Sequence, residues 1–393
     1  MTDTNSAVEA TAHAEEAVRK EHEREAAAKA QGGRFAHGNE TYLALVWRRF
    51  RRSVVGMIGL VMVLALLIMA VFADFFAPVN PKENGVAFAP PETLSFFNKD
   101  GSFTLWPRVY PIVENGEFDP VTFQPLTGPD YDNPHEIGFF VRGYEYEIFW
   151  LIPSDIHFFG GRDGKPVHLL GTDKFGRDIL SRAIVGSRIS LTIALIVVFL
   201  TTTLGTGIGI TSGYLGGRLD TWTQRFVDMV LAFPQLPLYL ALTSLIPITA
   251  PSNVFIAFVI GVMAALGWAQ LSREVRGKTL ALARVDYVRA AMAVGAGDGR
   301  IIARHILPNV LSHVIVSVTL AIPAIVLLES FLGFLGFAVK PPLISWGLML
   351  QDTGSFSVIG SYPWILSPVG FVLVTVFAFN ALGDGLRDAI DPY

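Results

Sequence analysis

Apolar residues in this chain gather into long blocks that polar segments separate. The first block, VVGMIGLVMVLALLIMAVFA at residues 54–73, is uncharged. Its length of about twenty residues is what a helix needs to cross a bilayer. Further apolar blocks lie near residues 190–212, 227–248, 253–270, 309–330 and 364–382. The pattern predicts an all-α membrane protein with six transmembrane helices.

The polar segments predict the remaining organisation. Residues 1–40, rich in Ala, Glu, Lys and Arg, predict a disordered or transiently helical tail, and residues 41–73 an interfacial helix followed by the first transmembrane helix. The first apolar block begins too late for a signal peptide, so we expect it to be retained. Residues 74–169 predict an extracytoplasmic insertion with short strands, because stretches such as GFFVRGYEYEIFWLI (138–152) alternate. Residues 170–393 form the core membrane domain.

Composition narrows the class of protein. The chain is 51% hydrophobic and only 16% charged, whereas soluble domains carry about 25% charged residues. A net charge of -4 provides no basic field for nucleic acid. Without cysteine there is no disulfide framework, no thiolate metal site and no cysteine nucleophile.

Basic residues predict the orientation in the membrane. Arg48, Arg49, Arg51 and Arg52 immediately precede the first apolar block, which places the N-terminus in the cytoplasm. Basic residues recur between blocks two and three and between blocks four and five, whereas residues 331–363 hold one lysine. Six spans therefore place both termini inside, residues 271–308 inside, and residues 74–169 and 331–363 outside.

The segment DYVRAAMAVGAGDGRIIARHILPN, residues 286–309, predicts two short helices around a bend. We expect Asp286 and Asp298 to cap the two helices and Gly295 or Gly297 to supply a left-handed turn. Pro308 marks the entry to the fifth span. The small pair Ala290 and Ala291 leaves the first helix thin on one side, which suits close approach of a partner. A helix lying on lipid headgroups is the alternative.

This segment resembles the cytoplasmic EAA loop of ABC importer permeases, with E-A-A, three residues, Gly, nine residues, then I-x-L-P. Five residues fit: Ala290, Ala291, Gly295, Leu307 and Pro308. Arg289 and His305 stand where the general pattern has Glu and Ile. Both departures resemble the dipeptide/oligopeptide branch, which has Y-V-R-A-A and R-H-I-L-P-N.

Three other stretches resemble the same branch: residues 169–191, 330–350 and 379–392. The resemblance implies a type I permease fold in the inner (plasma) membrane, paired with a homologous second permease. It implies that two cytoplasmic ABC ATPases bind the coupling loops of the permeases, in this chain residues 282–308, with Tyr287 to Ala293 as the helix that they contact. It also implies that a substrate-binding protein docks outside. Oligopeptides are the favoured cargo, with oligosaccharides as the alternative.

No catalytic residue, metal or cofactor is expected. Gly277-Lys278-Thr279 imitates the end of a phosphate-binding loop, but Ser272 stands where that loop requires glycine. The histidines 157, 168, 305 and 313 are scattered, and the sequence has neither HExxH nor GxSxG. We therefore expect no nucleotide site in this chain.

Charged groups near the spans are candidates for function because ionisable groups are costly in lipid. Glu329, six residues after Pro323, has two alternatives: a gate or translocation role in a pocket opened by a kink, or a structural pairing with Arg or Lys. Asp228 is expected at the inner interface. Arg177, Asp178, Arg182 and Arg188 are expected to cap and anchor the second span, and its glycines 205, 207, 209 and 213 to mediate helix packing.

Two functions from other classes remain alternatives. A secondary transporter or channel working alone would need an inverted repeat and midspan carboxylates, which the sequence does not display. A membrane scaffold whose cytoplasmic loop docks a soluble partner is the other, because docking loops and coupling loops have similar sequences.

Overall fold

A computed structural model describes residues 42–97, 102–118, 125–148, 151–162, 164–247 and 249–390. The predicted tail, residues 1–40, lies outside the described residues. The chain divides into two units, residues 1–49 and 50–393. The helix α2 (Tyr42–Phe50) carries Arg48 and Arg49 in its last turn. The second unit holds the membrane bundle and the insertion.

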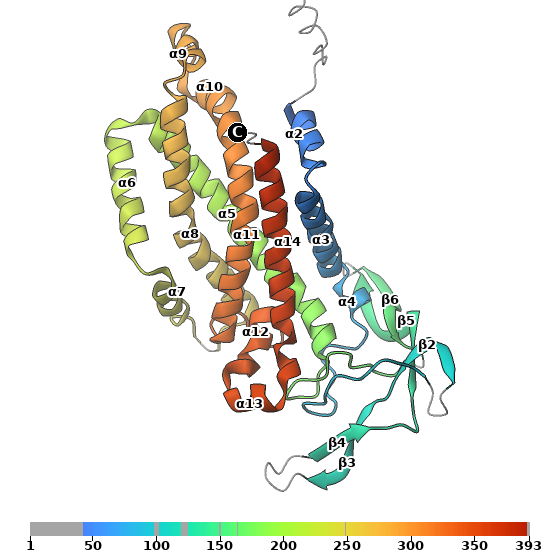
Figure 1. Cartoon of the computed structure of the whole chain (residues 1–393). Helices are drawn as coiled ribbons and strands as arrows, with labels where there is room; N and C mark the ends of the chain where they lie inside the picture. Colours follow the sequence, from blue (N-terminus) through green and yellow to red (C-terminus); the bar gives the residue numbers. More distant parts are fainter. Residues whose placement is uncertain are drawn as a thin grey trace, which may run out of the picture. The chain divides into compact units, whose positions relative to one another are not determined.

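Five helices within the described residues are long and apolar enough to cross a membrane. They are α3 (Val54–Val71), α5 (Ile179–Leu215), α8 (Ser252–Leu282), the continuous helix of α10 (Asp298–Ile301), η2 (Ile302–Ile306) and α11 (Leu307–Phe334), and the final helix of η4 (Pro363–Leu366) and α14 (Ser367–Ile390). They run side by side in Figure 1. Each contains one of the apolar blocks, which confirms five of the six spans.

The third span is not the single helix over residues 227–248 that the apolar pattern predicts. It is a bent pair, α6 (Gly217–Ala232) and α7 (Gln235–Thr243), with an angle of 82° between the two. Pro234 lies at the break and takes a non-helical conformation as the N-cap of α7. Proline lacks the N–H that a continuing helix needs. The bundle has six spans when this pair is counted as one.

Glycines of α5 bring its backbone against α8. A Cβ at Gly205, Gly209 or Gly213 would lie 2.6–2.9 Å from backbone carbonyl oxygens of α8. Their four-residue spacing places them on one helix face. The packing role expected for these glycines is confirmed at three positions. At Gly207 a Cβ would have no neighbour within 4 Å among the described atoms.

The apolar core of the bundle joins its first and last spans. Gly56 and Gly59 of α3 approach α14 so closely that a Cβ would meet Gly385 at 2.8 Å and Leu382 at 2.3 Å. Further along α3, Trp346 is fully buried among residues of α3, α5, α11 and α14. Trp346 begins the short helix α12 (Trp346–Leu350), which η3 (Gln351–Gly354) and α13 (Phe356–Ser361) follow.

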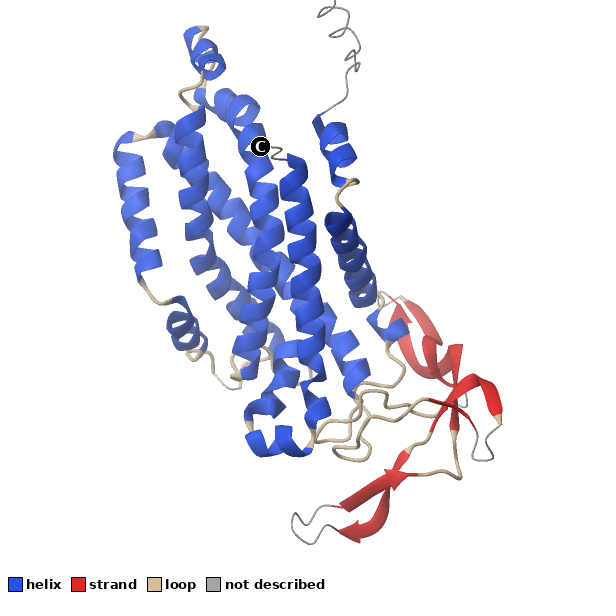
Figure 2. Cartoon of the chain, viewed as in Figure 1, coloured by secondary structure: helices blue, strands red, loops and turns tan. Residues whose placement is uncertain are grey.

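The insertion after α3 contains the predicted strands (Figure 2). It starts with α4 (Ala73–Phe76) and continues through β1 (Ser95–Phe97), β2 (Phe103–Val109), β3 (Ile112–Phe118), β4 (Pro125–Pro129), β5 (His135–Ile148) and β6 (Ile152–Gly161). Within the described residues, β1-β2-β5-β6 form one antiparallel sheet and β3-β4 a second. β5 is longer than the short strands expected, at 14 residues.

Long-range contacts divide the bundle into two ends. Lys174 pairs with Asp352 at 2.8 Å, and the indole N–H of Trp364 donates to the Thr172 carbonyl at 3.2 Å. These contacts join the insertion side of α5 to the segment between α11 and α14. At the opposite end of α5, the Tyr214 hydroxyl lies 3.0 Å from the Asp298 carboxylate. Residues predicted outside therefore meet at one end, and residues 286–309, the predicted coupling segment, lie at the other.

Candidate functional site

The short helix α9 (Asp286–Ala293) lies between α8 and α10, at the end of the bundle away from the insertion (Figure 1). Its C-terminus is closed by Gly295, whose φ is +82°. The N–H of Gly295 donates to Met292, and the N–H of Ala296 donates to Ala291, at 3.0 and 3.1 Å. This pair of bonds is a Schellman cap, which glycine stabilises because it adopts positive φ without strain. The left-handed turn predicted at Gly295 or Gly297 is thus at Gly295.

The helix packs on the bundle mainly through the apolar side chain of Val288. Val288 is fully buried in a cluster with Ile210 of α5, Val275 of α8 and Ile301 of α10. Ala291 is half-buried against this cluster. Tyr287 is 43% exposed, and Val294, just after the helix, is 85% exposed. Most of the helix surface is therefore open.

The two predicted aspartate caps are wrong. Val285 is the N-cap of α9 and Gly297 that of α10, and Asp286 and Asp298 are each the first residue inside their helix. Both caps have extended backbone dihedrals, so each helix begins one residue earlier than the expected cap requires. A carboxylate inside the first turn still interacts favourably with the helix dipole. Asp298 also contacts Tyr214, as described above.

The entry to the fifth span is a π-helical turn. Residues Ile302–Ile306 form η2, which continues into α11 at Leu307 with Pro308 in its first turn. Because Pro308 has no N–H, the carbonyl four residues earlier loses its α-helical partner. The amide of Asn309 donates to the His305 carbonyl at 2.7 Å and to the Tyr287 hydroxyl at 3.3 Å. Leu307 is half-buried in the Val288 cluster.

The structure therefore brings Tyr287, Ala291, Gly295, Leu307 and Pro308 together at one end of the bundle, with Ala290 exposed on the open face of α9. Sequence reasoning missed the three residues that hold this segment: Val288, Asn309 and Tyr214. Val288 was recognisable as a large apolar residue on α9. The other two act through contacts that no local pattern reveals.

Glu329 lies near the other end of α11 and is fully buried. The Ser190 hydroxyl of α5 donates to the Glu329 carboxylate at 2.9 Å. The same hydroxyl accepts a hydrogen bond from the backbone N–H of Trp346 at 3.1 Å. Glu329 makes no salt bridge with an Arg or Lys among the described residues. α11 also continues through Pro323 without a break.

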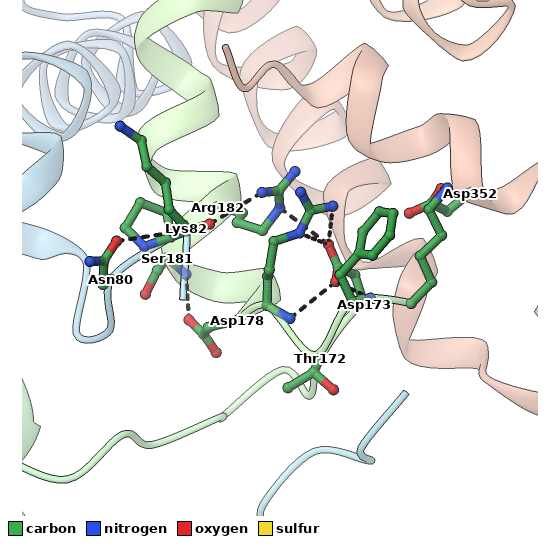
Figure 3. Close-up of polar contacts among 12 residues, drawn as sticks. Asn80, Lys82, Thr172, Asp173, Asp178, Ser181, Arg182 and Asp352 are labelled. Carbon is green, nitrogen blue, oxygen red and sulfur yellow. Dashed lines mark hydrogen bonds and ion pairs between the residues drawn. The ribbon is translucent and has the colours of Figure 1, made fainter. Parts of the chain in front are cut away.

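The lead-in to α5 is braced by charge (Figure 3). Asp178 is the N-cap of α5 and accepts from the Ser181 N–H at 2.7 Å. Asp173 pairs with Arg177 at 2.7 Å and with buried Arg182 at 3.4 Å. Arg188 pairs with Asp74 of α4 at 2.9 Å. The predicted anchoring role of these charges is confirmed, with Asp173 as the partner that sequence reasoning missed.

A histidine outside the spans joins this brace. The Nδ1 of His168 lies 3.1 Å from the Asp178 carboxylate, and the His168 N–H donates to Glu92 at 3.0 Å. Burial lowers the pKa of His168, but the hydrogen bond and charge of Asp178 and the charge of Glu92 outweigh burial, so its pKa is raised. Burial raises the pKa of Glu92 against the opposing bond from His168.

The other singled-out residues have structural positions. Asp228 pairs with Arg273 of α8 near one end of α6. His157 is fully buried, with its ring nitrogens 2.9 and 3.0 Å from backbone carbonyls. Lys278 lies inside α8. Among the described residues, no group of three His, Asp or Glu side chains could hold a metal ion.

Two protein families match parts of this chain that lie on either side of the strands of the insertion. Residues 205–393 match the family "Binding-protein-dependent transport system inner membrane component", and residues 41–91 match "N-terminal TM domain of oligopeptide transport permease C".

Curated relatives include the oligopeptide transport system permease protein OppC of Haemophilus influenzae, 41% identical over 57% of this chain and 70% of the relative. The OppC protein of Bacillus subtilis is 39% identical over 63% and 77%. The dipeptide transport system permease protein DppC of Bacillus subtilis is 36% identical over 57% and 68%. With its apolar bundle and strand-bearing insertion, the chain belongs to the family of binding-protein-dependent transport system inner membrane components, as a permease of the oligopeptide and dipeptide branch.

Proposed function

We propose that this permease carries oligopeptides or dipeptides inward, using ATP that separate subunits hydrolyse. The names of its relatives support the cargo. In this proposal the chain lies in the inner membrane beside a homologous second permease. Two cytoplasmic ABC ATPases contact the permeases from inside, and a substrate-binding protein docks on the extracytoplasmic side.

One observation supports the coupling role: α9 is a regular helix with a complete C-terminal cap, yet it stays largely exposed. A helix of eight residues is too short to be stable alone, yet α9 is closed by a Schellman cap and held by Val288. Such a helix presents a rigid surface without belonging to the core. In this proposal the open face around Tyr287 and Ala290 contacts an ATPase, whereas Ala291 and Gly295 allow the close packing and the tight turn.

In this proposal, contacts of α9 and α10 with α5 and α11 transmit the motion of the ATPases to the transmembrane helices. Asn309 joins Tyr287 to α11, and Tyr214 joins the start of α10 to α5. Leu307 and Pro308 form the junction where α10 becomes α11. When the ATPases close, α9 moves with them and tilts α5 and α11 together. This is a rigid-body change of access.

The orientation follows from the same proposal. If α9 contacts cytoplasmic ATPases, then residues 282–308 are inside and both termini are cytoplasmic, while the insertion at residues 74–169 faces outward. The arginines at 48, 49, 51 and 52 support this orientation. We propose four segments with this orientation: a tail at residues 1–40, an interfacial helix and first span at 41–73, an insertion at 74–169, and a core permease domain at 170–393.

We further propose that the chain has no nucleotide site of its own. A phosphate loop presents free N–H groups from a turn between strand and helix. Lys278 instead lies within the 31-residue helix α8, whose backbone N–H groups bond along the helix. The purified chain should neither bind nor hydrolyse ATP specifically, and Lys278→Ala should leave nucleotide binding at background. Saturable hydrolysis lost in Lys278→Ala would contradict this division of labour.

We propose that Glu329 affects gating without contacting substrate, by holding neighbouring helices together. Because it is buried against Ser190 and Trp346, it can hold α12 to α5 and α11 without contacting substrate. Glu329→Gln keeps an acceptor for Ser190 and should retain more transport than Glu329→Ala. Equal transport by both variants would remove this role.

Reconstitution tests the whole proposal. Vesicles containing both permeases and the ATPases, with binding protein outside, should accumulate a labelled oligopeptide only when ATP is inside. The control is this chain alone in vesicles with an imposed proton or sodium gradient. Uptake by the chain alone would support a secondary transporter, and an intact complex that docks ATPases but moves no peptide or oligosaccharide would support a scaffold.

A further inference from the structure

The strands β5 and β6 form a hairpin, and the sequence between them has none of the residue types that usually form turns in water. The sequence over residues 148–152 is Ile-Phe-Trp-Leu-Ile. The N–H of Leu151 donates to the Ile148 carbonyl at 3.2 Å, which closes the turn. Leu151 is 82% exposed and Ile152 is 60% exposed. Hairpin turns in water favour Gly, Asn, Asp and Pro, so the described apolar residues at this tip, Ile148, Leu151 and Ile152, indicate different surroundings.

The tip lies beside the end of the first membrane-spanning helix. A small pocket joins the two: Val71 and Phe72 at the end of α3 line it together with residues near the end of β5 (Tyr146, Glu147 and Ile148), and Asp74, Phe75 and Arg188 complete the lining. Val71 and Phe72 are themselves 49% and 38% exposed. Figure 1 shows the hairpin next to the junction of α3 and α4. The apolar surface of the tip thus continues the outward-facing surface of a transmembrane helix.

Polar contacts fix the hairpin at this position. The imidazole Nδ1 of His157 on β6 lies 2.9 Å from the Asp74 carbonyl oxygen, and the Tyr144 hydroxyl of β5 donates to the same oxygen at 3.4 Å. The Asp74 carboxylate pairs with Arg188 of α5 at 2.9 Å. The hairpin is therefore held to the ends of two transmembrane helices. Its height relative to the bilayer is set by the bundle.

A second apolar group lies on the same hairpin. Phe139 and Phe140 are 62% and 67% exposed. Phe140 has φ +53°, a conformation that is rare for a bulky side chain and often marks a functional position. The Phe140 ring centroid lies 6.3 Å from that of Phe75 on α4 and 5.9 Å from that of Phe158 on β6. Aromatic side chains concentrate at membrane–water interfaces.

We propose that the β5–β6 hairpin rests on the outer leaflet of the membrane, with Leu151 and Ile152 between headgroups and acyl chains and Phe139 and Phe140 at headgroup level. The lipid surface covers the exposed apolar side chains, and the insertion is thereby held down at its α3 side. The continuity with α3 favours lipid over a protein partner as the occupant.

Fluorescence quenching tests the proposal in the full-length chain, which has no native cysteine. Leu151→Cys is labelled with an environment-sensitive dye in phosphatidylcholine–phosphatidylglycerol vesicles. Some lipids carry a nitroxide near the headgroup or, in a parallel sample, deep in the acyl chain. The dye should be quenched more strongly by the shallow nitroxide, at a depth of about 5–10 Å.

Two labelled controls bracket the result. Val61→Cys on α3, where the native side chain is 62% exposed, should be quenched more strongly by the deep nitroxide. Glu117→Cys on β3 should be quenched by neither lipid. A Leu151→Cys dye that emits as in water, like the Glu117→Cys dye, would overturn the proposal. So would a dye in apolar surroundings that neither lipid quenches, because a protein would then cover the tip.

A charge variant gives a second measurement. In Leu151→Glu combined with Ile152→Glu, hydrogen exchange of the amides near the end of β5 should become faster, because the tip leaves the membrane. Phe118→Glu on β3, at another exposed apolar site, should leave that exchange unchanged. Identical exchange in the two variants would contradict membrane contact.

Discussion

The side-chain amide of Asn309, in the first turn of α11, donates a hydrogen bond to the Tyr287 hydroxyl of α9 at 3.3 Å. The same amide holds the His305 carbonyl beside the π-helical turn. Tyr287→Phe should reduce substrate-stimulated ATP hydrolysis of the assembled complex while leaving insertion intact, since one hydrogen bond is worth about 1 kcal/mol. Asn309→Ala should reduce it by a similar or larger amount. In the double variant the effects should be less than additive, and full additivity would mean that the contact does not transmit motion.

Gly295 and Gly297 offer a matched pair for the turn after α9. Gly295 has φ +82°, where another residue costs about 1–2 kcal/mol, and Gly297 has φ -69°, which any residue adopts. Among the described atoms, neither site has a neighbour that an added Cβ would meet. Gly295→Ala should therefore weaken stimulated ATP hydrolysis and Gly297→Ala should not. Gly295→Pro, which also removes a hydrogen bond, should abolish it. Equal activity of all three variants would exclude the coupling role.

Cysteine labelling tests the orientation. Asn115→Cys lies on exposed strand β3 of the insertion, and Ala296→Cys follows α9. In intact cells with a permeable outer envelope, an impermeant maleimide should label Asn115→Cys and leave Ala296→Cys unlabelled until the membrane is opened. The reverse pattern would invert the bundle and remove the basis for ATPase contact.

The glycine face of α5 predicts a sharp contrast in stability. A Cβ at Gly209 would lie 2.6 Å from the Ser272 carbonyl oxygen, whereas at Gly207 it would meet no described atom within 4 Å. Gly209→Ala should destabilise the chain by about 1–3 kcal/mol, the usual cost of overpacking. Gly207→Ala should be neutral. Thermal unfolding in detergent measures the difference, and equal midpoints would place the α5–α8 contact elsewhere.

The His168 brace predicts a dependence of stability on pH. Its pKa in the folded chain is raised, so its stabilisation is fully present below the unfolded value of about 6.5 and is lost as pH rises through the folded value. The raised pKa of Glu92 acts in the same direction. The unfolding midpoint should fall above pH ~6.5, and His168→Gln should flatten that fall. His305→Gln, at the other end of the bundle, is the control. An unchanged slope in His168→Gln would assign the pH dependence to other groups.

Local patterns in the sequence predicted the bundle well because a bilayer crossing requires a long apolar run. They also predicted Gly295, since few residues adopt positive φ. The break at Pro234 was missed because the apolar run continues across it. The cap positions were missed by one residue, because Val285 and Gly297 already have the extended conformation.

Contacts across long sequence separations could not be predicted from local patterns. Ser190 and Glu329 are 139 positions apart, and Tyr214 and Asp298 are 84 apart. Each pair depends on which faces the packed helices turn toward one another. The sequence therefore located the candidate segment, and the packed structure revealed what holds it.

The glycine contact between α5 and α8 has a mechanical consequence. α5 has 37 residues and is about 55 Å long at about 1.5 Å per residue. Two helices whose backbones approach this closely resist bending together, like a single thick beam. Tyr214 lies near one end of this beam and the Asp173 brace near the other. We expect a displacement of α5 at the Tyr214 end to be transmitted to the end near Asp173 as a rigid tilt of the helix, because little of it is lost to bending.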